Sequence, residues 1–298
     1  MIRYSCFNLT SKDYGDMIFG NPTSKILVSK VVAKGDLKAA VDKAVALIGG
    51  LPAFVSPDDK VLIKANFNSP DRYPASSDPE FIKAVVTLLK ESGVTKIALG
   101  ASSGLAWQPT EKVLKKKKVF KLTEELNIKL INFDEGGWTN IPINGVHFKS
   151  VAVAKAALDA DKIIYLPNLK THSLARFSMG LKFAVGLTEP FSRRMLHDEH
   201  LEEKVVEINL AVKPALIILD ARKCLVTGGP AKGRKKRPNG VLASSDLIAL
   251  DVEALKILIS FKAKNRLDLP IWELPQIAFA KKLGLGAQSE KDYVVLSG

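Results

Sequence analysis

Cysteine is scarce in this sequence. The 298 residues include two cysteines, Cys6 and Cys224, which lie far apart and form no CxxC pair. An iron–sulfur cluster or a cysteine-rich zinc site takes several closely spaced thiolates, and a disulfide framework takes several cysteine pairs. We therefore expect no iron–sulfur cluster within this chain, and we expect both thiols to be reduced.

Long hydrophobic runs are also missing. No segment approaches the roughly 18 uninterrupted apolar residues that a membrane-spanning helix needs. The first ten residues lack the basic and then apolar pattern of a signal peptide. These two absences predict a cytoplasmic protein that does not enter a membrane.

Acidic residues are outnumbered, and aromatic residues are few. There are 44 Lys and Arg against 31 Asp and Glu, which gives a formal net charge of +13. The excess is densest in residues 115–118 and 234–237, and neither run contains an aromatic ring. Single-stranded nucleic acids are held by basic residues together with stacking aromatics. We therefore expect a small anionic ligand or an acidic protein partner rather than nucleic acid, with a solvated lysine-rich surface as the alternative.

Short apolar runs rich in Ile and Val alternate with segments of helical periodicity. The expected strands are residues 26–32, 60–65, 96–99, 129–133, 147–152, 161–166, 215–219 and 293–296. The expected helices are residues 36–48, 79–92, 110–126, 199–211, 245–260 and 276–283, with N-caps at Asp36, Asp78 and either Ser245 or Asp246. This order predicts an α/β fold with a mainly parallel sheet and helices on both faces. We expect either one domain over residues 1–298 or two lobes that meet near residue 155.

Polar, basic or glycine-rich segments follow four of the expected strands. Ligands collect at the carboxyl ends of parallel strands, so these segments should form one site. The glycine-rich segments 100–104 and 228–233 match neither a dinucleotide fingerprint nor a P-loop, but their N–H groups could hold an anion. The residues expected to bind a ligand or cofactor are Lys64, Asn66, Ser102, Ser103, Gly229 and Gly233.

Lys170 and His172 carry the strongest chemical signal. They follow an apolar strand, where a shifted pKa is easiest to arrange. A lysine there could act as a base, a covalent anchor or a phosphate clamp, and a histidine as an acid, a base or a metal ligand. An ordinary exposed loop is the alternative.

Two further residues complete the expected catalytic set. Lys182 stands in an apolar stretch between Gly180 and Gly186, and a lysine in such a setting needs a partner or a function. Asp220 ends its expected strand, where a carboxylate could orient a base, bind a metal or cap the structure. We expect Lys170, His172, Lys182 and Asp220 to be catalytic.

His197 is the candidate metal ligand. His197 and His200 are three residues apart, which places both on one face of a helix. This is not the HExxH zinc pattern, and the sequence identifies no third ligand. Exposed histidines at a helix start are the alternative, and His147 is expected on an ordinary strand surface.

Taken in order, these motifs resemble a known family. They are Lys64-x-Asn66, Leu166-Pro167-x-Leu169-Lys170-Thr171-His172, Gly180-x-Lys182-x-x-x-Gly186, Leu196-His197, Asp220 and Gly229-Pro230-x-x-Gly233. This pattern, over about residues 25–260, resembles the prokaryotic proteins grouped as domain of unknown function 362. That family is uncharacterised, so the resemblance implies a fold and a site more than an activity. Many members carry a ferredoxin-like iron–sulfur module, which implies redox or anaerobic metabolism and, for this chain, a ferredoxin-like redox partner.

A more distant resemblance is to nickel-pincer lactate racemase, since His172, Lys182 and His197 follow in similar order and spacing. This resemblance implies that Lys182 tethers a nickel-bearing organometallic cofactor, with His172 as acid or base and His197 as ligand. Racemase-type enzymes also place histidines on an earlier loop, and the corresponding residues 100–104 contain none. The sequence therefore leaves three possibilities for the cofactor: a metal, a tethered organometallic group, or neither of these.

Two functions remain in competition. One is an enzyme that acts on a small anionic substrate or a metal-containing cofactor in redox or anaerobic metabolism. The other is a non-catalytic binding module for an anionic ligand or an acidic redox partner. Turnover that depends on the lysines and histidines would distinguish the enzyme from the module.

Overall fold

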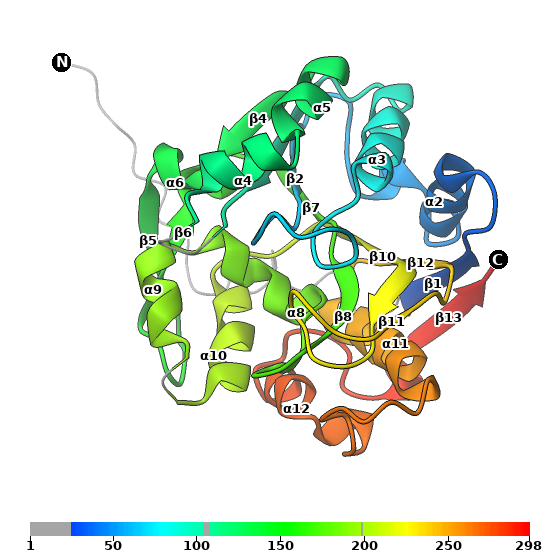
Figure 1. Cartoon of the computed structure of the whole chain (residues 1–298), viewed down its shortest axis with the longest axis vertical. Helices are drawn as coiled ribbons and strands as arrows, with labels where there is room; N and C mark the ends of the chain where they lie inside the picture. The colour runs from blue at the N-terminus through cyan, green and yellow to red at the C-terminus, as the bar shows by residue number, and fades with distance from the viewer. Residues whose placement is uncertain (1–24, 104–107, 198) are drawn as a thin grey trace.

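A large sheet forms the centre of the molecule (Figure 1). The structure is a computed structural model that describes residues 25–103, 108–197 and 199–298. In spatial order the main strands are β13 (Tyr293–Ser297), β1 (Ile26–Val32), β12 (Gly240–Ser244), β10 (Leu216–Leu225), β7 (Lys162–Tyr165), β2 (Lys60–Lys64), β3 (Lys96–Ala101) and β4 (Lys129–Asn132). Every neighbouring pair in this order is parallel except the two pairs that β12 makes. The predicted mainly parallel α/β sheet is confirmed.

Five shorter strands lie off this path. β8 (Asn168–His172) pairs with β10 and with β9 (Arg176–Phe177), and β11 (Lys235–Lys236) also pairs with β10. A separate antiparallel hairpin is formed by β5 (Trp138–Pro142) and β6 (Ser150–Ala154).

Helices cover both faces of the sheet (Figure 1). One face packs against α2 (Leu37–Ala46), α3 (Pro79–Glu91), α4 (Thr110–Lys116) and α5 (Val119–Glu125). The other face packs against α8 (Gly180–Phe183), α10 (Leu201–Glu207), α11 (Leu247–Ser260) and α12 (Pro275–Lys282). The short helices α6 (Phe133–Gly136), α7 (Lys155–Leu158) and α9 (Pro190–Met195) lie in the segments that connect the larger elements. None of the helices in the described ranges is long and apolar enough to cross a membrane.

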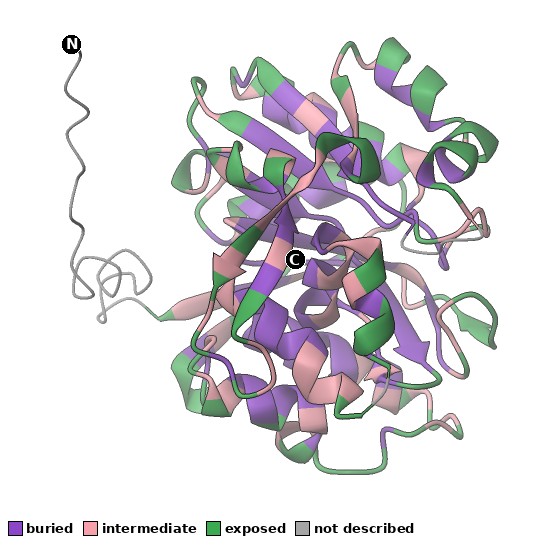
Figure 2. Cartoon of the chain, turned by 90° about the vertical axis from the view of Figure 1, so that its left-hand side faces the viewer, coloured by how far each residue is buried: buried purple, intermediate pink, exposed green. Residues whose placement is uncertain are grey.

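Alternate residues of the central strands point into different cores. Val61 and Ile63 of β2 belong to one hydrophobic core, and Leu62 between them belongs to the other. Successive side chains of a strand leave opposite faces, so a strand covered on both sides reads as a continuous apolar run. Figure 2 shows the buried residues concentrated along the central strands between the helices. The sheet therefore forms a rigid platform for the polar residues at its strand ends.

The predicted N-caps are confirmed. Asp36 accepts hydrogen bonds from the backbone of Lys38 and Ala39 at the start of α2. Asp78 does the same for Glu80 at 3.3 Å, at the start of α3. Asp246, rather than Ser245, caps α11. Each carboxylate satisfies an N–H group that the first helical turn leaves without a partner.

Several predicted boundaries are wrong. The helix expected over residues 110–126 is two helices, because Lys118 adopts a left-handed conformation with φ 56° between α4 and α5. The strand expected over residues 147–152 starts later, at Ser150. The strand expected to end at residue 219 runs on to Leu225, so Asp220 lies inside β10 rather than beyond it.

The segment after residue 166 is a second correction. It was expected to follow a strand that ends at residue 166, with an exposed loop as the alternative, but residues 168–172 form the strand β8, which joins the main sheet through β10. Its residues are all buried. Local periodicity does not predict such a strand, because its long-range partner, and not its own pattern, provides the hydrogen bonds.

Candidate functional site

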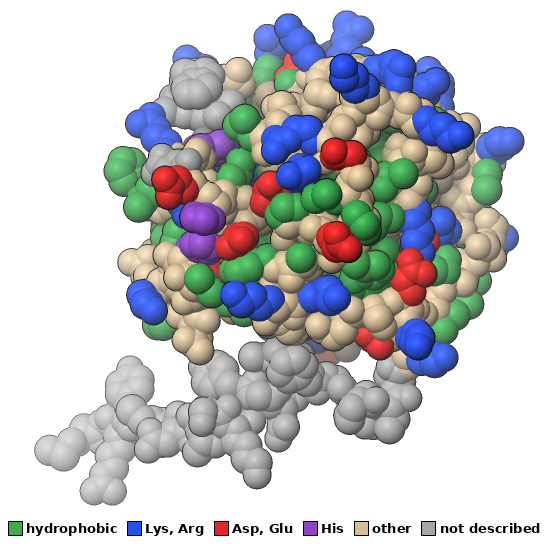
Figure 3. Space-filling view, turned by 90° about the horizontal axis from the view of Figure 1, so that it is seen from below, with side chains coloured by type: hydrophobic (Ala, Val, Ile, Leu, Met, Phe, Trp, Pro, Cys, Tyr) green, Lys and Arg blue, Asp and Glu red, His purple; other side chains and the backbone are tan. Residues whose placement is uncertain are grey.

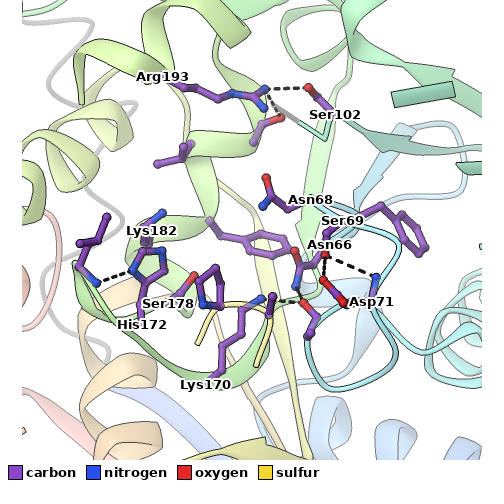
Figure 4. A pocket seen from close by; sticks show the side chains of 18 of the residues that line it. Asn66, Asn68, Ser69, Asp71, Ser102, Lys170, His172, Ser178, Lys182 and Arg193 are labelled. Carbon is purple, nitrogen blue, oxygen red and sulfur yellow. Dashed lines mark hydrogen bonds between the residues drawn. The ribbon is translucent and has the colours of Figure 1, made fainter. Parts of the chain in front are cut away.

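A cavity of about 390 Å³ lies where β2, β3 and β8 end. This volume is within the range of small-molecule sites. The residues singled out from the sequence that line it are Lys64, Asn66, Ser102, Lys170, His172, Lys182 and His197. Figure 4 shows Lys170, Lys182 and His172 on one side of this cavity and Arg193 with Ser102 further along it. The structure thus brings most of the expected site residues together.

Four expected residues do not line the cavity: Ser103, Asp220, Gly229 and Gly233. Ser103 is buried, and its backbone N–H donates to the Thr110 hydroxyl at 2.7 Å. Gly229 packs directly on the backbone of β8, and the neighbouring Pro230 and Ala231 reach the cavity instead. Gly104 and Cys6 lie outside the described residues.

Asp220 belongs to a separate polar network. Its carboxylate accepts hydrogen bonds from the Tyr73 hydroxyl at 2.8 Å and from the Arg222 guanidinium at 2.7 and 3.0 Å. Arg222 also pairs with Asp78 at 2.8 Å, at the start of α3. Burial raises the pKa of Asp220, and the hydrogen bond from Arg222 opposes that shift. These contacts fasten α3 to β10, and they occupy the carboxylate that was expected to be catalytic.

Lys64 reaches the cavity from the last position of β2. Its ammonium group lies 3.4 Å from the centre of the Phe183 ring, a cation–π contact. Burial lowers its pKa well below the ordinary value, and the nearby Arg193 lowers it further. Gly186 gives this ammonium group room, because a β-carbon there would lie 2.5 Å from the Lys64 Nζ.

Lys170 is buried and Lys182 is partly buried, and both amines have depressed pKa values. The Lys170 Nζ donates to the Ala75 carbonyl at 2.8 Å. Burial lowers the pKa of Lys170 to about 7, and the neighbouring Lys182 adds to that shift. Burial, followed by the charge of Arg193, lowers the pKa of Lys182 to about 8. Near neutral pH a substantial share of the Lys170 side chains is therefore the neutral amine, which can accept a proton.

Arg193 completes the site, and the sequence did not single it out. Its guanidinium donates to the Thr188 carbonyl, with the shorter bond at 2.6 Å, and to the Ser102 hydroxyl at 2.9 Å. Ser102 in turn donates to the Asp134 carboxylate at 2.6 Å. The sequence offers a signal for Arg193 in the apolar Leu196, which is three residues later. Leu196 is buried, and helical spacing places Arg193 on the same inward face.

His172 has a fixed tautomer. Its Nδ1 accepts the backbone N–H groups of Leu174 and Ala175 at 3.2 and 3.1 Å. An atom that accepts two N–H groups holds a lone pair, so the ring proton is on Nε2. Burial, followed by the charge of Lys182, lowers the pKa of His172 to about 2. His172 is therefore a neutral hydrogen-bond donor, and the expected roles of base and metal ligand do not fit it.

His197 has the opposite tautomer. Its Nδ1 lies 3.0 Å from the Arg193 carbonyl oxygen, which can only accept, so Nδ1 carries the proton. Its Nε2 then holds a free lone pair, as a metal ligand or a base requires. The expectation that His197 and His200 share one helical face is wrong. The first follows α9, and the second precedes α10 with a left-handed backbone, φ 56°.

Among the described residues that line the cavity, four basic side chains, Lys64, Lys170, Lys182 and Arg193, face one carboxylate, that of Asp71. Among the described residues, no carboxylate lies within ion-pair distance of Lys64, Lys170, Lys182 or Arg193. Asp71 lines the cavity and raises the pKa of Lys170 from a greater distance. Buried charges are ordinarily paired, so this arrangement is suited to an anion from outside the chain.

These pKa shifts predict how stability depends on pH. Between about pH 8 and pH 10, an unfolded chain keeps protons on Lys170 and Lys182 that the folded chain has lost, because their folded pKa values are depressed. The free energy of unfolding should then rise with pH, by up to about 1.4 kcal/mol per pH unit for each lysine. Urea denaturation of the ligand-free protein at several pH values measures this slope.

The double variant Lys170→Met, Lys182→Met is expected to lose most of the slope and to keep only the part that comes from Lys64, whose pKa is also depressed. The exposed control Lys112→Met should keep it. A free energy of unfolding that is flat or falls with pH in the wild-type protein would contradict the burial of these two amines.

The fold and the site together define a class: an α/β protein with a buried, cation-lined cavity at the ends of parallel strands. The chain belongs to the family described as Domain of unknown function (DUF362), whose model matches residues 61–256. The resemblance expected from the sequence motifs is confirmed.

The chain is similar to two known proteins. It is 29% identical over 269 residues to the thylakoid-associated protein sll1697 of Synechocystis sp., covering 87% of this chain and 79% of that protein. Among solved structures, it is similar to the lactate racemase apoprotein from Thermoanaerobacterium thermosaccharolyticum, with 14% identity and a TM-score of 0.47. That match covers 78% of this chain and 57% of the racemase chain.

Proposed function

We propose that this protein is an enzyme that acts on a small molecule carrying two or more negative charges. The observation that supports this most directly is a set of four basic side chains in the cavity, the buried Lys64, Lys170 and Arg193 and the partly buried Lys182. None of them has an acidic partner within ion-pair distance in the described ranges. Their charges depress one another's pKa values, and a bound anion would reverse that effect. Binding energy would then come from relieving this repulsion.

A proton-transfer reaction fits Lys170 and His172. The neutral amine of Lys170 would accept a proton from the bound substrate, so that a substrate bond to hydrogen breaks and an N–H bond forms. The negative charge left on the substrate would be stabilised by the Nε2–H of His172 and by the ammonium and guanidinium groups around it. His172 would stay neutral throughout, since its pKa is about 2.

Anion binding is tested first by thermal unfolding with inorganic phosphate, pyrophosphate and succinate as probes. At about 100 times its Kd, a ligand that binds the folded state adds about 2.7 kcal/mol, which corresponds to a rise in Tm of roughly 5 °C. Calorimetry near pH 8 should also show proton uptake on binding, because the anion restores the charged forms of Lys64 and Lys182, whose pKa values are depressed.

Lys170→Met and Arg193→Met should remove this rise in Tm, whereas Lys112→Met, at an exposed site, should retain it. A rise that all three variants share would place the anion elsewhere and refute the proposal. Binding without turnover of any candidate substrate would favour the alternative, a non-catalytic module for an anionic ligand.

A metal-containing cofactor is the second candidate, and the free Nε2 of His197 favours it. His197 would hold the metal, and the amine of Lys182, whose pKa is about 8, would form the tether. Such a group would supply redox or hydride chemistry when bound. The test of this cofactor is elemental analysis and intact mass measurement of the protein purified anaerobically from its native host, with the variant Lys182→Ala measured in the same way for comparison. The ferredoxin-like redox partner stays a prediction.

A further inference from the structure

The loop between β5 and β6 is fastened to α10 by one buried carboxylate. Glu207 is 0% exposed and accepts the backbone N–H groups of Val146, His147 and Phe148, the last at 2.8 Å. Three hydrogen bonds to a charged acceptor hold this backbone firmly. The position of His147 relative to α10 is therefore fixed by a residue that has no part in the cavity.

This fastening brings His147 against Glu203 of α10 and against His200, which directly precedes that helix. Its Nε2 lies 2.8 Å from the Glu203 carboxylate, and its ring stacks on that of His200 with the centroids 5.1 Å apart. One ligand atom from each of the three residues lies within 4.8 Å of the other two. Figure 3 shows histidine side chains beside acidic side chains on the surface of the molecule.

We propose that His147, His200 and Glu203 form a binding site for a transition-metal ion of the Zn²⁺ class. Two imidazole nitrogens and one carboxylate oxygen suit such an ion, and a water molecule would take the fourth position. Zinc–ligand bonds are about 2.0–2.2 Å, so the three donor atoms must move slightly closer together. His200 is exposed and Glu203 lies at the surface of α10, so both can make that movement.

The surroundings favour the ion over an ordinary ion pair. Within the described part of the chain, Glu203 has no lysine or arginine within ion-pair distance, whereas its neighbour Glu202 is paired with Arg176 at 2.9 Å. The Phe279 ring of α12 lies 5.7 Å from His147 and backs the site with apolar surface. The hydrogen bond between His147 and Glu203 explains only two of the three residues, and it leaves the placement of His200 unexplained.

The bound ion would cross-link the β5–β6 hairpin to α10. The side chain of Asn209, just after α10, donates to the Leu181 carbonyl at 2.8 Å, so α10 also supports the helix that carries Lys182. A metal here would therefore stabilise the wall of the cavity without touching its contents. This role is independent of the metal-containing cofactor considered for His197.

Calorimetric titration of the EDTA-treated full chain with ZnCl₂ tests the site. We expect one ion per chain and a zinc-induced rise in Tm. His200→Ala and Glu203→Gln should each weaken binding at least about tenfold and abolish the rise in Tm. His200 is exposed, and glutamine can still hydrogen bond with His147, so both variants should fold.

His197→Ala distinguishes this site from the cavity, because it removes a cavity-lining histidine that is outside the cluster. It should bind zinc as the wild type does. Loss of zinc binding in His197→Ala but not in His200→Ala would move the ion to the cavity and overturn the proposal. Wild-type protein that binds no zinc stoichiometrically would also overturn it.

Discussion

Gly229→Ala is expected to lower the free energy of unfolding by more than about 3 kcal/mol. A β-carbon at this position would lie 1.9 Å from the carbonyl oxygen of Thr171 and 2.7 Å from its carbonyl carbon. That carbonyl belongs to β8, which is held by β9 and β10, so the backbone cannot easily move away. The residue also has φ +76°, a conformation that alanine adopts at a penalty of roughly 1–2 kcal/mol.

Gly284→Ala separates the clash from the backbone strain. Gly284 has a similar φ of +70°, but a β-carbon there would meet nothing within 4 Å. We expect it to lose only about 1–2 kcal/mol, the strain alone. Chemical denaturation of the two variants measures the difference. Equal losses would show that residues 228–233 do not pack on β8 as described.

Asp251→Ala is expected to lower the free energy of unfolding by about 2–5 kcal/mol. Asp251 is fully buried in α11 and accepts the N–H groups of Gly180 and Leu181 at 2.7 and 2.9 Å. Each buried N–H group that loses its acceptor costs about 1–3 kcal/mol. Because these groups begin α8, Asp251 is also a positioning residue for Lys182, and the anion-induced rise in Tm should shrink in the variant.

Asp251→Asn provides the matched comparison. An amide keeps one acceptor oxygen, so its loss of stability should be intermediate. Burial raises the pKa of Asp251 to about 7, so its folded state binds a proton more readily than the unfolded chain does. Its contribution to stability should therefore fall as pH rises from about 4 to about 7, and Asp251→Asn should abolish that fall. An unchanged profile would show that this carboxyl is not buried.

The local features of the fold were predictable because they depend on neighbours in sequence. Asp36 and Asp78 cap their helices through N–H groups two or three residues away, and the apolar run at β2 reflects burial on both faces. Two strands that were not predicted, β8 and β12, depend on distant partners. β8 forms because β10 extends to Leu225, and residues 240–244 become β12 because β1 and β10 lie on either side.

Some residues of the candidate site could likewise be predicted from the sequence, and others could not. Lys170, His172 and Lys182 could be identified because basic groups in apolar surroundings are unusual in any sequence. Arg193 was missed because one apolar residue at helical spacing, Leu196, is a weak signal for distinguishing it from its neighbour Arg194, which is exposed. His200 was paired with His197 on helical spacing, but a left-handed residue turns the chain and its ring stacks on His147 instead.

The sequence by itself therefore determined the α/β class, the family and the basic residues that the site would contain. Only the tertiary structure decided which of these cations share one cavity, which carboxylates are absent from it and which nitrogen of each histidine holds the proton. Hydrophobic periodicity and helix capping act over a few residues and are visible in the chain itself. A pKa or a hydrogen-bond partner depends on burial and on charges a few ångströms away in space, and these are contributed by segments far apart in the sequence.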